Sequence, residues 1–223
     1  MNESAFSYWD KHPEIAASFV TGMSYWNTAP GFEAHQILNH FDFSSLPSGA
    51  RFVDVGGSLG HTCIEVARRH SHISTIVQDL PATIDNVPSD IVPAAIRGRV
   101  QFMKHDMFKP QPVHGADIYY FRAVLHDWSD ASCVEILQNL IPALKPGARI
   151  LVMDTCLPRF GEVSMMEERR LRSLDLTMKA FANARERSEE DWERLFSTAD
   201  KRFGSFKVQL PRSSQKLALI SVV

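Results

Sequence analysis

Five polar residues follow short apolar runs in this sequence, and their side chains are of types that bind polar ligands or move protons. They are Asp54, Asp79, Asp106, His126 and Asp154. The apolar runs are predicted as strands and alternate with helical patterns, which indicates a parallel sheet. Ligands of such sheets bind at the carboxyl ends of the strands. The five residues therefore predict one site that combines several carboxylates with an imidazole able to accept a proton.

A cluster of glycines follows Asp54, between the first predicted strand and a helical pattern over 62–69. Glycine allows a sharp turn close to a ligand, and the N-terminus of the helix offers free N–H groups. Gly56 and Gly60 have Ser58 between them, and this spacing differs from the Gly-x-Gly-x-x-Gly of nicotinamide dinucleotide sites. The turn is therefore either a different nucleoside site or an ordinary connection between strand and helix.

Two of the acids could contact a nucleoside. Asp79 ends the second predicted strand, 19 residues after Gly60 (79 − 60), where a carboxylate could accept hydrogen bonds from both ribose hydroxyls. Alternatively, Asp79 caps the helix that follows. Asp106 could accept a hydrogen bond from an adenine amine while Met107 and Phe108 cover the ring. These three could equally be ordinary loop and core residues.

Composition excludes several classes of protein. The 223 residues are 44% hydrophobic, enough for one sizeable core, and the net charge of −2 does not indicate a surface for nucleic acids or membranes. No apolar run approaches the roughly 18 residues of a membrane span, and no signal peptide is evident. The three cysteines and nine histidines are not spaced as metal ligands. We therefore expect no metal, and a cytoplasmic location fits the cysteine usage.

Two segments carry apolar side chains at helical spacing, one over 4–27 and one over 164–181. Each either packs on the core or forms a wall of an apolar substrate pocket, to which methionine adapts well. The candidate pocket residues are Phe19, Met23, Trp26 and Met178.

From about residue 52 to the C-terminus, the chain resembles the plant-type small-molecule O-methyltransferases, a family that includes fungal secondary-metabolite enzymes. The resemblance implies a Rossmann-like α/β fold of class I methyltransferases, with a mostly parallel seven-stranded sheet, helices on both faces and a C-terminal antiparallel hairpin. The most specific match is the run His126-Asp127-Trp128-Ser129-Asp130. The other matches are Val53-Asp54-Val55-Gly56-Gly57, Gln78-Asp79-Leu80-Pro81, Asp106-Met107-Phe108 and Glu186-Arg187.

The resemblance also implies a reaction, in which a methyl group passes from S-adenosylmethionine to a hydroxyl, expected to be phenolic, of a small secondary metabolite. His126 matches the family's base, and Asp154 and Glu186 match its two supporting acids, although many relatives carry Glu at the position of Asp154. The residues implied in cofactor binding are Asp54, Gly56, Gly57, Asp79, Leu80, Asp106, Met107, Phe108 and Arg122.

Residues 1–48 match only the helices that connect the catalytic domain of this family to an N-terminal dimerisation domain. We therefore expect a helical segment over 1–48 ahead of a catalytic domain over 49–223, and a homodimer or partner subunit where the missing domain is supplied. Two other functions stay open. The chain could bind S-adenosylmethionine and catalyse a cyclase or pericyclase reaction, or it could be a non-catalytic subunit that binds a partner.

Overall fold

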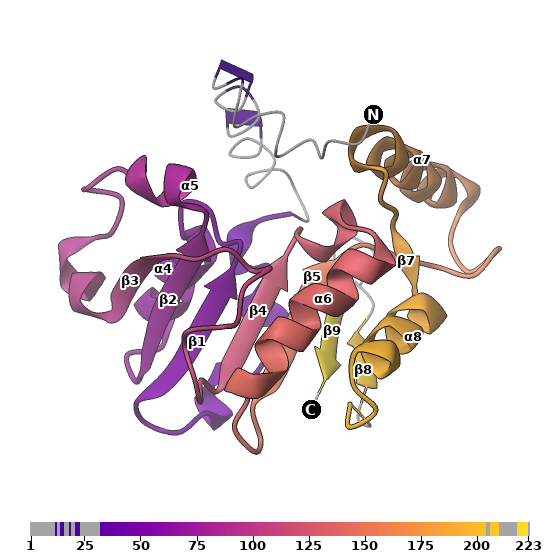
Figure 1. Ribbon diagram of the computed structural model, residues 1–223. Coiled ribbons are helices and arrows are strands. Elements are labelled where there is room, and N and C mark those ends of the chain that lie inside the picture. Colours follow the sequence, from indigo (N-terminus) through magenta and orange to yellow (C-terminus); the bar gives the residue numbers. More distant parts are fainter. Residues whose placement is uncertain are drawn as a thin grey trace.

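A seven-stranded sheet forms the centre of the protein, shown by a computed structural model that describes residues 12, 14, 15, 18, 21, 22, 32–203, 206–209 and 218–222. The order across the sheet is β3-β2-β1-β4-β5-β9-β8 (Figure 1). The first five strands are parallel, and β9 runs antiparallel to β5 and β8. The predicted α/β fold with a C-terminal antiparallel hairpin is thereby confirmed. The strands are β1 (Ala50–Val55), β2 (Ile73–Asp79), β3 (Val100–Lys104), β4 (Ile118–Arg122), β5 (Arg149–Asp154), β8 (Phe206–Gln209) and β9 (Ala218–Val222).

Both faces of this sheet are buried, which explains why its central strands are almost continuously apolar. Alternate residues of a strand point to opposite faces. In β1, Val53 and Val55 belong to the core beneath α6 and α8, whereas Phe52 belongs to the core beneath α4. The longer helices are α4 (His61–Arg69), α6 (Asp130–Leu140), α7 (Met165–Ala182) and α8 (Glu189–Ala199).

Short elements complete the described part of the chain. Within the segment predicted to be helical at the N-terminus, Phe32, Ile37 and Phe43 are buried in the same core as α4. A small parallel sheet lies outside the main one and pairs β6 (Cys156–Leu157) with β7 (Arg187–Ser188). The short helices are η1 (Ala34–Gln36), α3 (Ile37–His40), η2 (Phe43–Ser45), α5 (Pro81–Asp85), η3 (Ala94–Arg99), η4 (Leu125–Asp127) and η5 (Ile141–Ala143).

A serine side chain caps the N-terminus of three of the helices. Ser129 accepts a hydrogen bond from the backbone of Ser132 at the start of α6, and Ser164 accepts one from Glu167 at the start of α7. Ser188 and Asp191 form a reciprocal capping box on α8. These caps fix where the loops at the upper edge of the sheet in Figure 1 stop and the helices start. In the part of the chain that the structure describes, no helix has both the length and the apolar character needed to cross a membrane.

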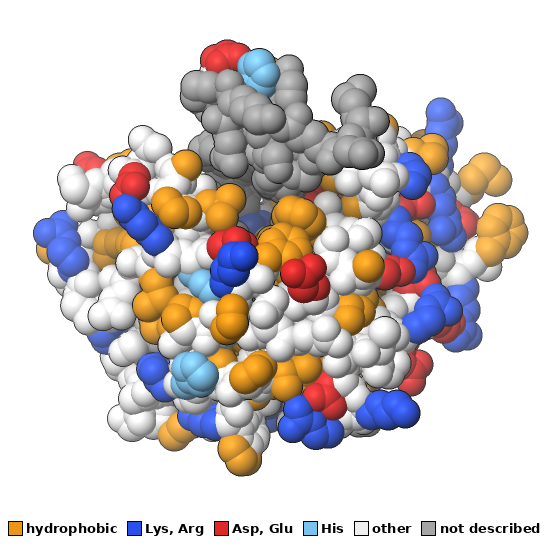
Figure 2. Space-filling view, viewed as in Figure 1, with side chains coloured by type: hydrophobic (Ala, Val, Ile, Leu, Met, Phe, Trp, Pro, Cys, Tyr) orange, Lys and Arg blue, Asp and Glu red, His pale blue; other side chains and the backbone are white. Residues whose placement is uncertain are grey.

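Most residues of the long helix α7 are not buried. Of its residues, Leu171 is the buried one, whereas Met165, Met166 and Leu176 are exposed. Figure 2 shows hydrophobic side chains among Lys and Arg side chains over α7 and the segment before it. The interpretation of its apolar stripe as core therefore holds for Leu171 and fails for Met166, whereas Leu174, Met178 and Phe181 are half-buried. In Figure 1, α7 lies beside the sheet.

Candidate active site

The glycine turn after β1 is held against the end of β2. The backbone N–H groups of Gly56 and Gly57 both donate to the carbonyl of Gln78, over 2.8 and 3.1 Å. The N–H of Ser58 donates to Asp79 Oδ2 over 2.8 Å. Gly56 has a φ of +75°, and Ser58 has a φ of 50°, so the chain reverses sharply here. The result is a tight turn that presents the carboxylate of Asp79 at the sheet edge.

The turn also packs directly on Asp54. A Cβ added at Gly57 would lie 2.8 Å from Cγ of Asp54, so only glycine fits there. Asp54 is 3% exposed, and its burial raises its pKa to about 7 against the opposing charge of Arg122. Burial also raises the pKa of Asp79, against the hydrogen bonds from the N–H groups of Ser58 and Leu80. The N-cap residue of α5 is Leu80, but the carboxylate of Asp79 contacts both the glycine turn and the side chain of Thr83 in α5.

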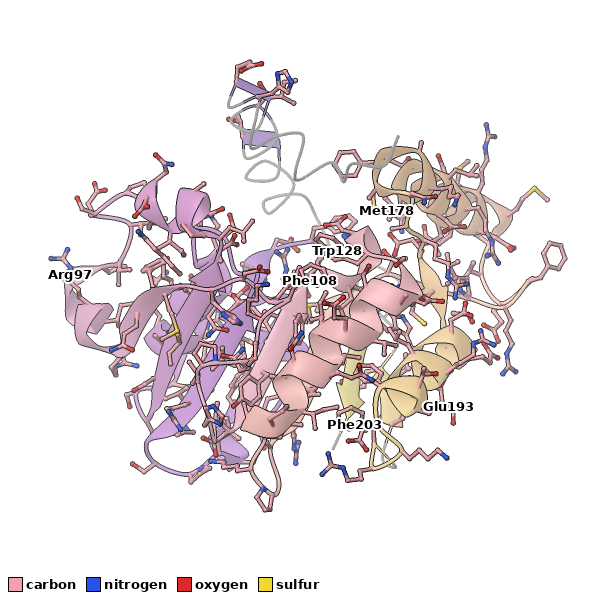
Figure 3. The ribbon with its side chains drawn as sticks, viewed as in Figure 1. Arg97, Phe108, Trp128, Met178, Glu193 and Phe203 are labelled. Atoms are coloured by element: carbon pink, nitrogen blue, oxygen red, sulfur yellow. The ribbon has the colours of Figure 1, made fainter. Side chains whose placement is uncertain are left out.

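The loop after β3 carries the residues predicted to contact adenine. Asp106 Oδ1 accepts from the N–H of Phe108 over 3.0 Å, and the carbonyl of Phe108 accepts from Asn139 Nδ2 over 3.1 Å. The Phe108 ring packs edge-on against Trp128, with 4.7 Å between centroids, and the two lie side by side in Figure 3. Met107 packs against the core beneath α6. These hydrogen bonds and the ring contact hold the loop next to the segment that contains His126.

The remaining charged residues of the site, Arg122 and Asp154, lie at the ends of β4 and β5. Arg122, the last residue of β4, donates from Nη2 to the carbonyl of Phe32. Asp154, the last residue of β5, is fully buried. Between these strands the chain turns at Ala123, whose φ is +50°, and enters η4, which carries His126. The parallel pairing of β4 with β5 therefore brings His126 next to Asp154.

Three carboxylates surround the imidazole of His126. Its Nδ1 lies 3.0 Å from Glu186 Oε1, and its Nε2 lies 3.7 Å from Asp127 Oδ1. Asp154 Oδ2 accepts from the backbone N–H of His126 over 3.2 Å. The two predicted supporting acids therefore make different contacts, because Glu186 binds the ring whereas Asp154 binds the backbone. Asp127 was given no role from the sequence, and its position beside the histidine in the run was the available signal.

The charges of these groups are strongly coupled. Burial opposes the charge on His126, but Asp154, Glu186 and Asp127 outweigh it and raise the pKa of His126 to about 10. Burial raises the pKa of Asp127 to about 6, and burial also raises that of Glu186. Among the described residues, Asp154 Oδ1 and Glu186 Oε2 are buried without a hydrogen-bond partner. A site with this excess of acids favours a cationic ligand.

A family model described as an O-methyltransferase domain matches residues 1–201 of this sequence. The chain belongs to this family. The O-methyltransferase of the grayanic acid biosynthesis cluster of Cladonia grayi is 42% identical, and the match covers 100% of the chain and 49% of that relative. The chlorophenol O-methyltransferase of Trichoderma longibrachiatum is 37% identical over 99% of the chain and 48% of that relative. The chain thus spans about half the length of these relatives.

Solved structures of other proteins share this fold. Mitomycin 7-O-methyltransferase MmcR superposes with a TM-score of 0.81 at 24% identity, covering 99% of this chain and 60% of that one. A pericyclic reaction enzyme superposes with a TM-score of 0.75 at 25% identity, covering 100% of this chain and 56% of that one. The predicted class I methyltransferase fold is therefore confirmed for this chain.

The predicted pocket residues are placed only in part. Phe19, Met23 and Trp26 lie outside the described residues. Met178 is half-buried on α7, a helix that contacts η4, which carries His126. Within the described ranges, no set of His, Cys, Asp and Glu side chains has the arrangement of a metal site.

Proposed function

We propose that this chain is the catalytic part of an S-adenosylmethionine-dependent O-methyltransferase that acts on a phenolic hydroxyl of a small secondary metabolite. His126 is the base that removes the hydroxyl proton. The observation that carries this proposal is the hydrogen bond of 3.0 Å between His126 Nδ1 and Glu186, at the sheet edge where the glycine turn and Asp79 also lie. A histidine whose other nitrogen is held by an acid is oriented for proton transfer.

The residues of the sheet edge fit the cofactor. Asp79 would hold the ribose, and the loop of Asp106, Met107 and Phe108 would enclose the adenine, while Asp54 and Gly57 shape the turn between them. When bound, S-adenosylmethionine supplies an electrophilic methyl group on a positively charged sulfur. The excess of carboxylates around His126, including the unpartnered oxygens of Asp154 and Glu186, suits a ligand with that charge.

An imidazole base favours a phenol over an alkyl alcohol as the substrate, because a phenol, with a pKa of about 10, is the stronger acid. In the protein alone, the carboxylates raise the pKa of His126 to about 10 against the effect of burial. A cation bound nearby lowers the pKa of the imidazole. Binding of the methyl donor would thus bring His126 into the neutral state in which it accepts a proton.

The test is the substitution His126→Ala in the full chain. S-adenosylhomocysteine release is measured with S-adenosylmethionine and a panel of phenols that includes chlorophenols. We expect the rate to fall by about 10²–10⁴-fold, with S-adenosylhomocysteine affinity unchanged. His114→Ala, at an exposed loop position, is the matched control and should keep the rate. Transfer at the original rate by His126→Ala would show that another group is the base.

One observation favours a second function. The likeness to the solved pericyclic reaction enzyme means that this fold also occurs in a protein that catalyses another reaction. In that case product would form from a substrate without release of S-adenosylhomocysteine. Measuring S-adenosylhomocysteine per molecule of product separates the two functions, and a ratio of one supports methyl transfer.

A further inference from the structure

The buried guanidinium of Arg187 contacts the chain on both sides of His126. Arg187 is fully buried. Its Nη1 donates to the carbonyl of Leu125 over 2.8 Å, and its Nη2 donates to the carbonyl of Trp128 over 2.8 Å. These two carbonyls flank His126 and Asp127, so one side chain spans the whole turn that carries the imidazole.

The remaining surroundings of the guanidinium fix its position. Its Nε donates to Asp130 Oδ1 over 2.9 Å, and its Nη2 lies 3.4 Å from Cys133 Sγ. Its central carbon lies 5.1 Å from the centroid of the Trp192 ring. A buried cation is destabilising unless it is paired and hydrogen-bonded. All three nitrogens of the planar guanidinium donate hydrogen bonds, and these bonds fix its orientation.

The backbone of Arg187 joins the same turn to the two supporting acids. Arg187 directly follows Glu186, and in the pairing of β7 with β6 it lies opposite Cys156. Cys156 comes two residues after Asp154 (156 − 154). Arg187 therefore links the segments of Glu186, Asp154 and His126, which are distant in the sequence.

We propose that Arg187 is a positioning residue for methyl transfer, which holds η4 so that His126 Nδ1 stays within hydrogen-bond distance of Glu186. This inference rests on the proposed function, in which His126 is the base. Lysine cannot replace arginine here, because an ammonium group lacks the planar fork that reaches two carbonyls and a carboxylate together. In the Arg187→Lys variant, η4 is free to move away from Glu186.

The test compares Arg187→Lys with Arg185→Lys in the full chain. Arg185 also pairs with Asp130, over 2.7 Å, but its side chain is 42% exposed and its bonds go to the carboxylates of Asp130 and Asp191. The first readout is the pKa of His126 from NMR titration of its imidazole, assigned with His126→Asn. We expect a lower pKa in Arg187→Lys, because the Glu186 bond that raises it is weakened, and no change in Arg185→Lys.

The second readout is the pH profile of kcat with a phenol that the chain methylates. We expect kcat of Arg187→Lys to fall about 10²-fold, with its low-pH limb shifted to lower pH, and S-adenosylhomocysteine affinity unchanged. If Arg187→Lys does not fold, Asp130→Ala removes the acceptor of Nε and should lower the pKa of His126 in the same direction. A pKa of His126 that stays unchanged in the folded variants overturns the proposal. Failure of the proposed function is read separately, from undiminished transfer by His126→Ala.

Discussion

At the scale of single residues, the main feature is one imidazole among three acids. His126 contacts Glu186 through its ring and Asp154 through its backbone, and Asp127 lies 3.7 Å from its second nitrogen. Burial of these groups makes each unpaired charge costly, which is why the proton on His126 is held so firmly. In the protein alone the imidazole is charged at neutral pH, since its pKa lies at about 10. A cationic methyl donor would compete with that proton for the same acids.

This charge predicts a pH dependence of stability. The pKa of His126 is raised from 6.5 to about 10 on folding, because the carboxylates outweigh burial. Its stabilising contribution is therefore complete below pH 6.5 and is lost as pH rises towards 10. In His126→Gln, the free energy of unfolding should fall less steeply over this range, by on the order of a few kcal/mol. Urea unfolding at several pH values measures it. His114→Gln should follow the unchanged protein, and parallel curves for all three would contradict the prediction.

At the scale of elements, a pair of buried amides connects the end of β2 to the loop after β3. Gln78 Nε2 donates to Gln111 Oε1 over 2.7 Å, and Gln111 Nε2 donates back to Gln78 Oε1 over 2.9 Å. The backbone carbonyl of Gln78 also accepts from Gly56 and Gly57. One residue thus contacts both the glycine turn and, through Gln111, the loop of Asp106. The glycine turn and the loop of Asp106, which form the two halves of the proposed cofactor site, are therefore connected by hydrogen bonds through Gln78 and Gln111.

Breaking this pair should loosen the loop. In Gln111→Ala the amide of Gln78 is left buried without its main partner, which costs about 1–3 kcal/mol. We expect that loss in the free energy of unfolding and faster hydrogen exchange over 105–111, measured by mass spectrometry. Gln138→Ala, at an exposed position of α6, is the control. Equal stability and equal exchange in the two variants would mean that the loop is held by other contacts, such as Asn139 to Phe108.

At the scale of the whole molecule, every described residue of the proposed cofactor and base sites lies between Asp54 and Arg187, in the main sheet, its loops and the segment just before β7. The chain nevertheless spans about half the length of its curated relatives. The exposed apolar side chains Met165, Met166 and Leu176 lie along α7, beside this sheet. We therefore propose that the described residues of this chain bind the cofactor by themselves.

Binding of S-adenosylhomocysteine to the chain alone is therefore expected. Calorimetry should detect it, and Asp79→Asn should weaken it by about ten- to hundredfold, because a charged acceptor for the ribose is lost. Asp85→Asn changes an exposed acid of α5 that pairs with Lys104, and it should leave the affinity unchanged. If the folded chain bound nothing, the site would need residues outside it, and equal affinities in both variants would remove Asp79 from the ribose contact.

Local signals in the sequence predicted much of this fold. The strand and helix pattern and the glycine turn each depend on residues a few positions apart, where side chains and backbone interact whatever the rest of the chain does. The His126 run and the acids at strand ends were found in the same way, because a parallel sheet brings its carboxyl ends to one edge. The assignment of Asp154 and Glu186 to His126 came from resemblance alone.

Only the tertiary structure determined which groups meet. His126 and Glu186 are separated by 60 positions, and Arg187 and Leu125 by 62, so no local pattern relates them. The structure gave Asp154 a backbone contact, placed Asp127 beside the imidazole and buried Arg187 under η4. Arginine is usually a surface residue, so no feature of the sequence predicted a buried Arg187. Its burial is favourable because backbone carbonyls, an acid and an aromatic ring surround it. The sequence by itself determined which elements form and which sheet edge carries the proposed site, whereas long-range packing decided how the imidazole of His126 is held.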